Sequence, residues 1–256
     1  MKPITVAGHP LAGGNLPAVC IPLVATTAEA LLAEARAAGA RKPDLVEWRV
    51  DFFDGIVNAD TTAVLAAGLR AAAGVPLLFT RRSTREGGQP IALDEAGVMR
   101  LYEAVCAARA ADIVDMELSC DARHLRAVRE ASRAAGIGLL LSFHDFGGTP
   151  PAATMLETLR AMQRAGGDIG KIAVMPRSRA DVLALLQAVL QASEELEIPV
   201  AGMAMGELGA VTRVCGGAFG SALTFAVGQA ASAPGQIPID DLRAAIAALP
   251  PSASGF

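Results

Sequence analysis

Eight short apolar segments recur along the chain, and each is followed by a stretch rich in Ala and Leu. The segments span residues 18–24, 45–49, 77–82, 113–117, 139–144, 171–175, 200–205 and 222–227. They do not alternate strictly between apolar and polar residues, which is typical of parallel strands buried on both faces. Strands that alternate with helices predict a parallel sheet, and eight repeats favour a closed barrel over an open sheet.

The connecting segments carry the signals of helix ends. Residues 26–29, with the sequence TTAE, predict a capping box at the start of one helix, and Gly39 predicts its end. Asp94 and Ser178 predict the N-caps of two further helices, each with apolar side chains on one face. A last helix is expected from Ile239 to about residue 249, where two prolines end it.

Two further segments lie outside the repeat. Residues 3–16 predict a small hairpin, and residues 230–238 form a long polar loop of the kind that often closes over a ligand. The chain of 256 residues has the size of a one-domain barrel, roughly 250 residues. We therefore expect a single α/β domain over residues 1–256, a (β/α)8 TIM barrel with a short N-terminal β-hairpin.

Charge and cysteine content exclude several classes of partner. The formal net charge is −4 and charged residues make up 19% of the chain, with no basic face or tail for nucleic acid or an acidic membrane. No apolar stretch reaches the ~18 residues that span a bilayer, and the N-terminus lacks the apolar core of a signal peptide. The four cysteines form no CxxC pair, so we expect small buried side chains in a reducing cytoplasm and no zinc site.

Polar residues gather where the predicted strands end, which is where barrel enzymes place their active sites. They are Glu47, Arg49, Arg82, Glu86, Asp115, Glu117, His144, Lys171, Arg213, Ser232 and Gln236. Because side chains alternate faces with period two, Glu47 and Arg49 share one face of their strand, as Asp115 and Glu117 do. If the apolar sets pack on the helices, these polar sets point into the barrel. Their burial is unfavourable unless they pair or serve a ligand.

Lys171 is the most informative of these residues. It lies within a strand beside apolar residues such as Ile172, where burial and nearby arginines are expected to lower the pKa of its amine. A neutral amine can attack a ketone and form a Schiff base. Alternatively, Lys171 is a structural lysine that forms an ion pair with Glu86 or Asp115.

His144 is the only one of the three histidines at a predicted strand end. This position favours a general acid or base, although a buried histidine of the core is the alternative. His9 and His124 are expected at the surface.

Three arginines, Arg49, Arg82 and Arg213, predict a small anionic substrate, because a guanidinium group binds carboxylate through two hydrogen bonds. Salt bridges at the barrel rim are the alternative, and both can hold at once. Met203 and Met205 are interpreted as packing residues.

Several segments together resemble the type I 3-dehydroquinate dehydratases, shikimate-pathway enzymes that form an imine with their substrate. In chain order they are DLVEWRVD (44–51), FTRRS (79–83) with EGG (86–88), SFHDF (142–146), KIAVMP (171–176), MAMGELG (203–209), FGSALTF (219–225) and ASAPGQ (231–236). They cover nearly the whole chain, and their combination is far more specific than any one of them.

The resemblance implies a role for each matching residue. Lys171 would form the imine with the ring ketone. His144 would remove a proton from C2 and protonate the leaving C1 hydroxyl, and Glu86 would tune it. The substrate-binding residues would be Glu47, Arg49 and Arg82 for the ring hydroxyls, and Arg213, Ser232 and Gln236 for the carboxylate. The resemblance implies neither a metal nor an organic cofactor. It also implies that the protein forms a homodimer.

One residue departs from the family pattern. The first strand often carries a serine near the ligand, and the matching position here is Pro22. Proline offers neither a hydroxyl nor an N–H group, so the binding role is not carried over. A class I aldolase and a catalytically silent sensor of quinate-like ligands are the alternative functions. The presence of both Lys171 and His144 counts against the sensor.

Overall fold

The computed structural model describes residues 1–230 and 232–249. Residue 231 of the ASAPGQ segment and the two prolines predicted to end the last helix lie outside the described residues. Within the described part, no helix is long and apolar enough to cross a membrane.

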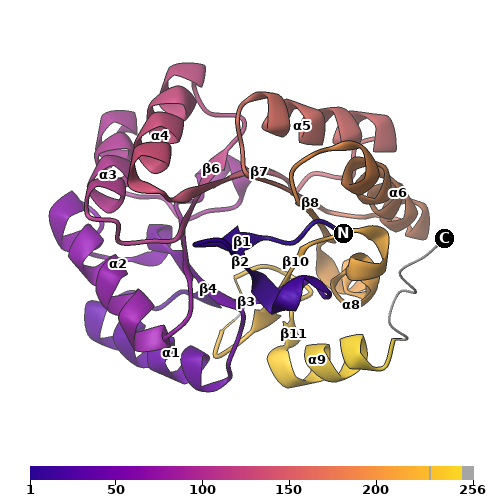
Figure 1. Cartoon of the computed structure of the whole chain (residues 1–256), viewed down its shortest axis with the longest axis horizontal. Helices are drawn as coiled ribbons and strands as arrows, with labels where there is room; N and C mark the ends of the chain where they lie inside the picture. Colours follow the sequence, from indigo (N-terminus) through magenta and orange to yellow (C-terminus); the bar gives the residue numbers. More distant parts are fainter. Residues whose placement is uncertain (231, 250–256) are drawn as a thin grey trace.

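Eight parallel strands run around the centre of the molecule, and helices surround them (Figure 1). The strands are β3 (Ala18–Leu23), β4 (Leu45–Arg49), β5 (Leu77–Thr80), β6 (Ile113–Glu117), β7 (Gly138–Asp145), β8 (Ile169–Val174), β9 (Val200–Ala204) and β10 (Leu223–Val227). Each pairs in parallel with the next from β3 to β9, and β10 pairs with β3. A single parallel bridge between Val200 and Ser221 joins the start of β9 to the start of β10. The predicted barrel is confirmed, with the β9–β10 seam joined at one end only.

A ninth strand was not predicted. β11 (Ile237–Pro238) follows the long last loop and pairs in parallel with the end of β10. It is too short and too rich in polar neighbours to give a strand pattern in the sequence.

The helices follow the strands in the expected order. They are α1 (Ala28–Ala40), α2 (Ala59–Ala73), α3 (Glu95–Ala107), α4 (Ala122–Ala135), α5 (Ala152–Arg164), α6 (Arg179–Glu195), the short α7 (Gly206–Gly209) and α8 (Val211–Cys215), and α9 (Ile239–Ala247). Asp94 and Ser178 cap α3 and α6 as predicted, and Ser178 forms a capping box with Asp181. Single turns of 3-10 helix, η2 (Val50–Phe52) and η3 (Thr84–Glu86), follow β4 and β5.

Two helix signals of the sequence were wrong. The N-cap of α1 is Thr27, whose side chain accepts a hydrogen bond from the N–H of Ala30, so residues 26–29 do not form a capping box. Gly39 does not end α1, which continues to Ala40. A Cβ atom at Gly39 would collide with the carbonyl of Ala73, so this glycine permits close packing of α1 on α2.

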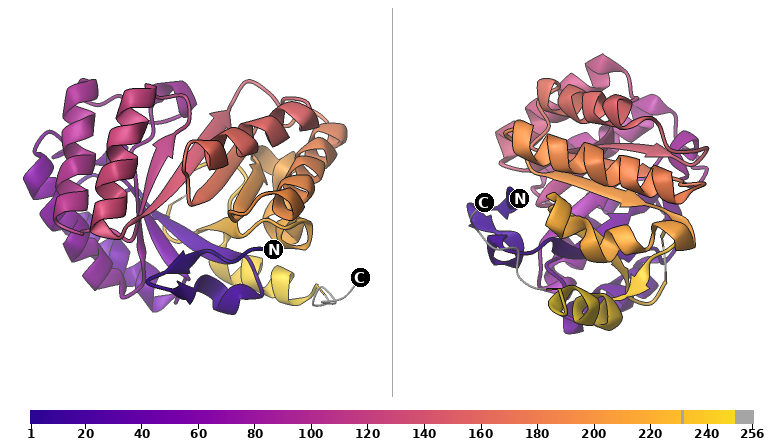
Figure 2. Two further views of the ribbon diagram at one scale, coloured as in Figure 1. Left: turned by 45° about the horizontal axis from the view of Figure 1, so that its top comes forward. Right: turned by 90° about the vertical axis from the view of Figure 1, so that its right-hand side faces the viewer.

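The predicted N-terminal hairpin is confirmed as β1 (Thr5–Val6) and β2 (His9–Pro10), paired antiparallel. It lies across one end of the barrel in Figure 1 and to one side of the barrel in Figure 2. Ile4, just before it, is 2% exposed and packs on residues at the starts of the strands, such as Leu45 and Leu78. The hairpin therefore closes the end of the barrel opposite the strand C-termini.

Candidate active site

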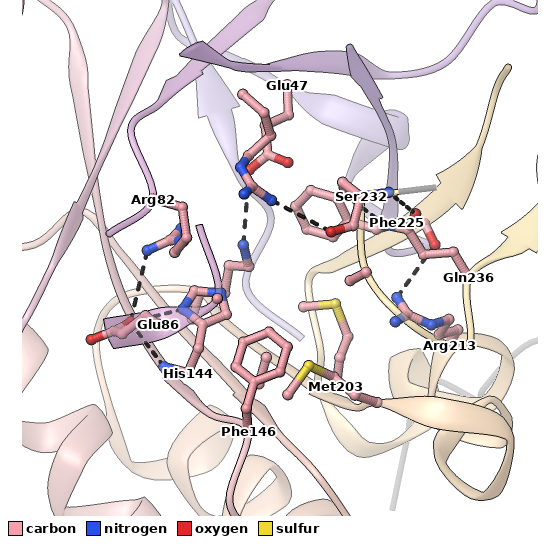
Figure 3. A pocket seen from close by; sticks show the side chains of 16 residues that line it. Glu47, Arg82, Glu86, His144, Phe146, Met203, Arg213, Phe225, Ser232 and Gln236 are labelled. Carbon is pink, nitrogen blue, oxygen red and sulfur yellow. Dashed lines mark hydrogen bonds and ion pairs between the residues drawn. The ribbon is translucent and has the colours of Figure 1, made fainter. Parts of the chain in front are cut away.

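A pocket opens at the C-terminal ends of the strands and encloses about 490 Å³ of space that is open to solvent (Figure 3). All nine residues to which the family resemblance assigns a catalytic or substrate-binding role line it, whereas Asp115 and Glu117 do not. The lining comprises Glu47, Arg49, Arg82, Glu86, Gly87, His144, Phe146, Lys171, Ala173, Met203, Met205, Arg213, Phe225, Ser232, Ala233 and Gln236.

Lys171 lies on β8 at the base of the pocket and is 6% exposed. Its Nζ is 3.9 Å from Oδ2 of Asp115, 4.0 Å from Oε1 of Glu47 and 4.5 Å from the centre of the Phe225 ring. Burial lowers the pKa of the amine, although Glu47 and Asp115 oppose the shift. These separations are long for an ion pair. The amine therefore lies between two carboxylates and forms a close hydrogen-bonded ion pair with neither.

His144 and Glu86 form a pair beside Lys171. Glu86 Oε2 lies 2.9 Å from Nδ1 of His144 and also accepts from the main-chain N–H of His144 at 3.0 Å. Burial lowers the pKa of the imidazole well below its usual value, and the charges of Arg82, Lys171 and Arg49 act in the same direction. A neutral ring that donates Nδ1–H to Glu86 carries its lone pair on Nε2.

Burial also changes the protonation of Glu86 itself. It raises the pKa of this carboxyl group to about 7, and the charge of Glu117 adds to the shift. A hydrogen bond of 2.8 Å from Oγ of Ser119 acts in the opposite direction.

Arg82 is fixed by a network of buried polar groups and is 3% exposed. Its Nη2 lies 2.6 Å from Asp115, and its Nη1 donates to Oγ of Ser142 at 2.7 Å. Ser142 in turn donates to Oδ1 of Asp115 at 2.6 Å. Arg82 therefore shapes the wall beside Lys171 through contacts within the protein, as the salt-bridge alternative predicts.

Arg49 is oriented by a residue to which the sequence analysis gave no role. Its Nε and Nη2 donate to the two oxygens of Asp51 at 2.9 and 2.8 Å. Asp51 also accepts from the main-chain N–H groups of Arg82 and Gln89 at 3.3 and 3.0 Å. Asp51 lies in the turn η2, after the end of β4, so the period-two pattern of the strand did not indicate its contact with Arg49.

Arg213, on α8, is 2% exposed. Its guanidinium group donates to the carbonyls of Pro234 at 3.1 Å and Phe225 at 3.5 Å. Burial lowers the pKa of Arg213 to about 10. Among residues 1–230 and 232–249 it forms no ion pair with a carboxylate, so its charge is not balanced within the described protein.

Ser232 and Gln236 hold each other in the last loop. Gln236 Oε1 accepts from the N–H of Ser232 at 2.9 Å, and its Nε2 donates to the Ser232 hydroxyl at 3.2 Å. The carbonyl of Ser232 accepts from Arg49 at 3.5 Å. Figure 3 shows this loop on the side of the pocket opposite His144.

The apolar lining was largely missed. Phe225 and Phe146 have no predicted role, and Met203 and Met205 were assigned to packing alone, yet all four line the pocket. Phe225 could have been found from parity, because it follows Leu223 on the inward face of β10. Phe146 follows the end of β7, where no strand pattern determines its direction.

The histidines outside the pocket differ in exposure. His9 is exposed as expected, whereas His124 is half-buried on α4, with Nδ1 3.9 Å from Glu95. Two cysteines, Cys20 and Cys106, are buried as expected, and Cys120 and Cys215 are half-buried. Within the described ranges, no group of three or more His, Cys, Asp or Glu side chains is placed to hold a metal ion.

A family model and several known proteins match nearly the whole chain. A family model described as type I 3-dehydroquinase matches residues 19–250. The 3-dehydroquinate dehydratase of Aromatoleum aromaticum is 46% identical over 255 residues, covering 99% of this chain and 98% of that protein. That of Geobacillus thermodenitrificans is 50% identical over 232 residues, covering 90% of each.

A solved structure agrees in fold as well as in sequence. The 3-dehydroquinate dehydratase of Geobacillus kaustophilus HTA426 superimposes with a TM-score of 0.92 at 49% identity, covering 96% of this chain and 95% of that one. One family thus accounts for the sequence segments, for the barrel and for the polar pocket at the strand ends. The chain belongs to the type I 3-dehydroquinase family.

Proposed function

We propose that Lys171 and His144 carry out the dehydration of 3-dehydroquinate to 3-dehydroshikimate in this enzyme, through an imine on Lys171. The activity is that of its family, a 3-dehydroquinate dehydratase, which is a hydro-lyase of the shikimate pathway. The observation that carries the imine is a buried lysine of lowered pKa next to a histidine of lowered pKa in one pocket.

The first step is attack of the neutral Lys171 amine on the ring ketone, followed by loss of water to give the iminium ion. Desolvation favours the neutral amine, which is the nucleophilic form. The iminium ion withdraws electrons from the adjacent carbon and makes its C–H bond more acidic. Glu47 and Asp115, whose oxygens lie 4.0 and 3.9 Å from Nζ, stabilise the positive charge that develops there.

His144 acts next as the base. With Nδ1–H donated to Glu86, the Nε2 lone pair removes the C2 proton, and the electrons of the C–H bond form the enamine. The enamine then expels the C1 hydroxyl, which takes the same proton from His144 and leaves as water. One group serving both steps from one side of the ring gives a syn elimination, and hydrolysis of the product imine releases Lys171.

Arg213, Ser232 and Gln236 bind the substrate carboxylate in this scheme. The buried guanidinium group of Arg213 donates to main-chain carbonyls, and its lowered pKa indicates that a negative ligand would stabilise it. Arg49, Arg82 and Glu47 bind the ring hydroxyls from the opposite wall, where Asp51 and Asp115 fix the two arginines.

A structure of the related enzyme from Clostridium difficile supports covalent chemistry at such a site. That protein, 32% identical with a TM-score of 0.90, was solved with covalent modified comenic acid. A class I aldolase would use the same imine, and a silent sensor would use none, so trapping of the imine separates the two enzymes from the sensor. Detection of 3-dehydroshikimate as the product separates the dehydratase from the aldolase.

The decisive experiment is borohydride reduction in the presence of 3-dehydroquinate, followed by peptide mass mapping. The chain has three lysines, Lys2, Lys42 and Lys171, so the adduct can be assigned without ambiguity. We expect one adduct on Lys171 in the wild type and in the control Lys42→Ala, and none in Lys171→Ala. An adduct elsewhere would overturn the site, and no adduct on folded protein would overturn the imine.

We also propose a homodimer in the cytoplasm. The dimer is the assembly that the family resemblance implies, and four free cysteines are typical of a reducing compartment. Light scattering should give about twice the chain mass of 26.1 kDa. A monomer at micromolar concentration would contradict the first proposal, and recovery of the protein outside the cytoplasmic fraction would contradict the second.

A further inference from the structure

Phe225 packs its ring against Nζ of Lys171 from the wall of the pocket. Nζ lies over the face of the ring, 4.5 Å from the ring centre. Both side chains are buried, since Phe225 is 3% exposed and Lys171 is 6% exposed. The face of a phenyl ring carries partial negative charge and attracts a cation within about 6 Å of its centre. The attraction is stronger where the cation is removed from water, as it is at this site.

The barrel wall fixes the position of the ring. Phe225 belongs to β10 and pairs with Cys20 of β3, and its carbonyl accepts from Nη1 of Arg213 at 3.5 Å. Its side chain lies on the inward face of β10 together with Leu223, in the apolar cluster that fills the strand starts. The ring therefore stays over Nζ unless that cluster rearranges.

The two carboxylates near Nζ are engaged by other partners. Asp115 accepts from Nη2 of Arg82 through Oδ2 and from Oγ of Ser142 through Oδ1, each at 2.6 Å. Glu47 accepts from Oγ1 of Thr80 at 2.9 Å through Oε1, its oxygen nearest Nζ. These donors hold the carboxylates at 3.9 and 4.0 Å from Nζ. Neither carboxylate therefore forms a hydrogen bond with the amine, and both act on it only through space.

The reaction proposed above changes the charge of Nζ. The lone pair of the neutral amine forms the bond to the substrate ketone, and loss of water from this adduct leaves one positive charge shared between Nζ and the carbon. Hydrolysis of the product imine returns the amine. The ring of Phe225 forms no bond and takes no proton in these steps, so it affects only the free energy of the charged form.

We propose that Phe225 is a further catalytic residue, whose ring face stabilises the iminium ion on Lys171. The proposal rests on the imine chemistry proposed above and assigns part of its stabilisation to an apolar residue. The iminium ion must keep its positive charge in order to withdraw electrons from the adjacent C–H bond. A phenyl ring favours that charge and, unlike a carboxylate, cannot remove the proton from the iminium nitrogen.

The test weakens the face of the ring and keeps the ring in place. Phe225 is replaced by phenylalanines that carry one, two or three ring fluorines, which withdraw charge from the face and change the volume little. In single turnovers quenched with borohydride, the rate of adduct formation on Lys171 should fall with each fluorine, by about tenfold for three. Phe225→Leu removes the ring and should lose at least as much. The fluorinated proteins keep the shape of the side chain, so they decide the question even if Phe225→Leu does not fold.

The dependence on pH separates stabilisation of charge from packing. In ligand-free protein, methylation of Lys171 by formaldehyde and borohydride requires the neutral amine. The pH of half-maximal methylation should fall as fluorines are added to Phe225, because the ring also stabilises the ammonium ion. Above this pH the full tenfold loss of adduct formation is expected. Below it the loss should be smaller, because the ring stabilises the ammonium and iminium ions alike.

The other groups that act on the charge of Nζ stay the same throughout the series. Burial lowers the pKa of the Lys171 amine. The titratable and charged side chains around it are Glu47, Asp115, Arg82, Cys20 and His144. The neighbouring strand β9 carries no titratable side chain. A change along the fluorinated series is therefore attributable to the ring.

The same fluorinated residues at Phe219 are the matched control. Phe219 is half-buried in the 3-10 turn η4 (Gly216–Phe219), before the start of β10, and it does not line the pocket. The rate of adduct formation and the pH of half-maximal methylation should both match those of the wild type. An equal fall in the Phe219 series would overturn the proposal.

Two further results would also overturn it. One is a rate that does not change in the Phe225 series above the pH of half-maximal methylation. The other is a loss in Phe225→Leu that the fluorinated proteins do not share, because the ring would then serve packing alone. If the wild type forms no adduct on Lys171, the imine chemistry itself fails. An adduct whose rate ignores the fluorines removes only the role of Phe225, so the two failures are distinguishable.

Discussion

The barrel interior holds two regions of opposite chemistry, separated by two residues along each of the five strands β4 to β8. Toward the strand starts lie Leu45, Leu78, Ile113, Leu140 and Ile169. Two residues further along the same strands lie Glu47, Thr80, Asp115, Ser142 and Lys171. Both sets are buried. Burial of the first set stabilises the fold. Burial of the second set removes hydration, and internal hydrogen bonds offset part of that unfavourable free energy.

The difference teaches that the fold and the chemistry depend on separate layers of one core. The apolar layer, together with Ile4 of the N-terminal segment, needs no ligand to be stable. Burial lowers the pKa of the Lys171 amine in the polar layer, and it also lowers the pKa values of His144 and Arg213, which line the same pocket. Changes in the polar layer should therefore damage activity more than stability, and changes in the apolar layer should do the reverse.

Lys171→Ala is the sharpest test of the polar layer. It removes the proposed nucleophile, so kcat should fall by roughly 10⁴-fold or more. The melting temperature should change little, because the substitution also removes a charge whose burial is unfavourable. A large loss of stability with activity partly retained would contradict the separation of the layers.

Leu78→Ala makes the opposite change in the apolar layer. Leu78 is completely buried, and its truncation should lower the free energy of unfolding by about 2–5 kcal/mol. Since Leu78 lies below the pocket, kcat and KM of the folded fraction should stay within about twofold of the wild type. Chemical denaturation and kinetics on the same preparation measure both quantities, and a tenfold loss of kcat would break the comparison.

The pH dependence should distinguish Glu86 from the other polar groups. Its pKa is raised to about 7, so the carboxylate is protonated as pH falls through that value. His144 then loses the acceptor for Nδ1–H, and kcat/KM should fall below about pH 7. In Glu86→Gln the fall in kcat/KM on the acidic side should occur at lower pH. Protonation of His144 would then cause the fall, and burial together with three cations lowers the pKa of His144. A fall that stays at pH 7 in the variant would assign it to another group.

The same two groups oppose each other in stability. The folded-state pKa of Glu86 is raised, so its contribution is present below its unfolded value of 4.5 and is lost as pH rises toward about 7. The folded-state pKa of His144 is lowered, so its contribution is present above 6.5 and is lost as pH falls below that value. Glu86→Gln should therefore leave stability that falls more steeply on acidification between pH 6.5 and 4.5. A pH profile of unfolding free energy identical to that of the wild type would contradict this assignment.

The sequence predicted those parts of the molecule that follow from periodicity. The eight strands, and the inward direction of Glu47, Asp115 and Lys171, follow from alternation along strands whose other face is apolar. Ser232 and Gln236 were assigned to the same end of the barrel from their place in the loop after the last strand, and the family resemblance added their role toward the carboxylate. The structure places Glu47, Lys171, Ser232 and Gln236 in one pocket. The roles of these residues in the reaction remain predictions.

What the sequence did not predict depends on contacts between distant segments. Asp51 faces Arg49 because a single turn of 3-10 helix reverses the chain after β4, and such a turn leaves no periodic pattern. Gly39 was interpreted as a helix stop, whereas its lack of a side chain serves the contact of α1 with α2.

The smallest expected effect comes from the edge of the apolar layer. Ile4 precedes the N-terminal hairpin, is 2% exposed and contacts the same cluster as Leu78. Ile4→Val removes one methylene group and should lower the free energy of unfolding by about 0.5–1.5 kcal/mol, with no change in kcat or in imine trapping. Because the hairpin closes the end of the barrel opposite the pocket, any effect on KM would show that the two layers communicate through the strands. Equal stability of wild type and variant would instead show that the hairpin only covers the barrel and that the apolar layer ends at the strand starts.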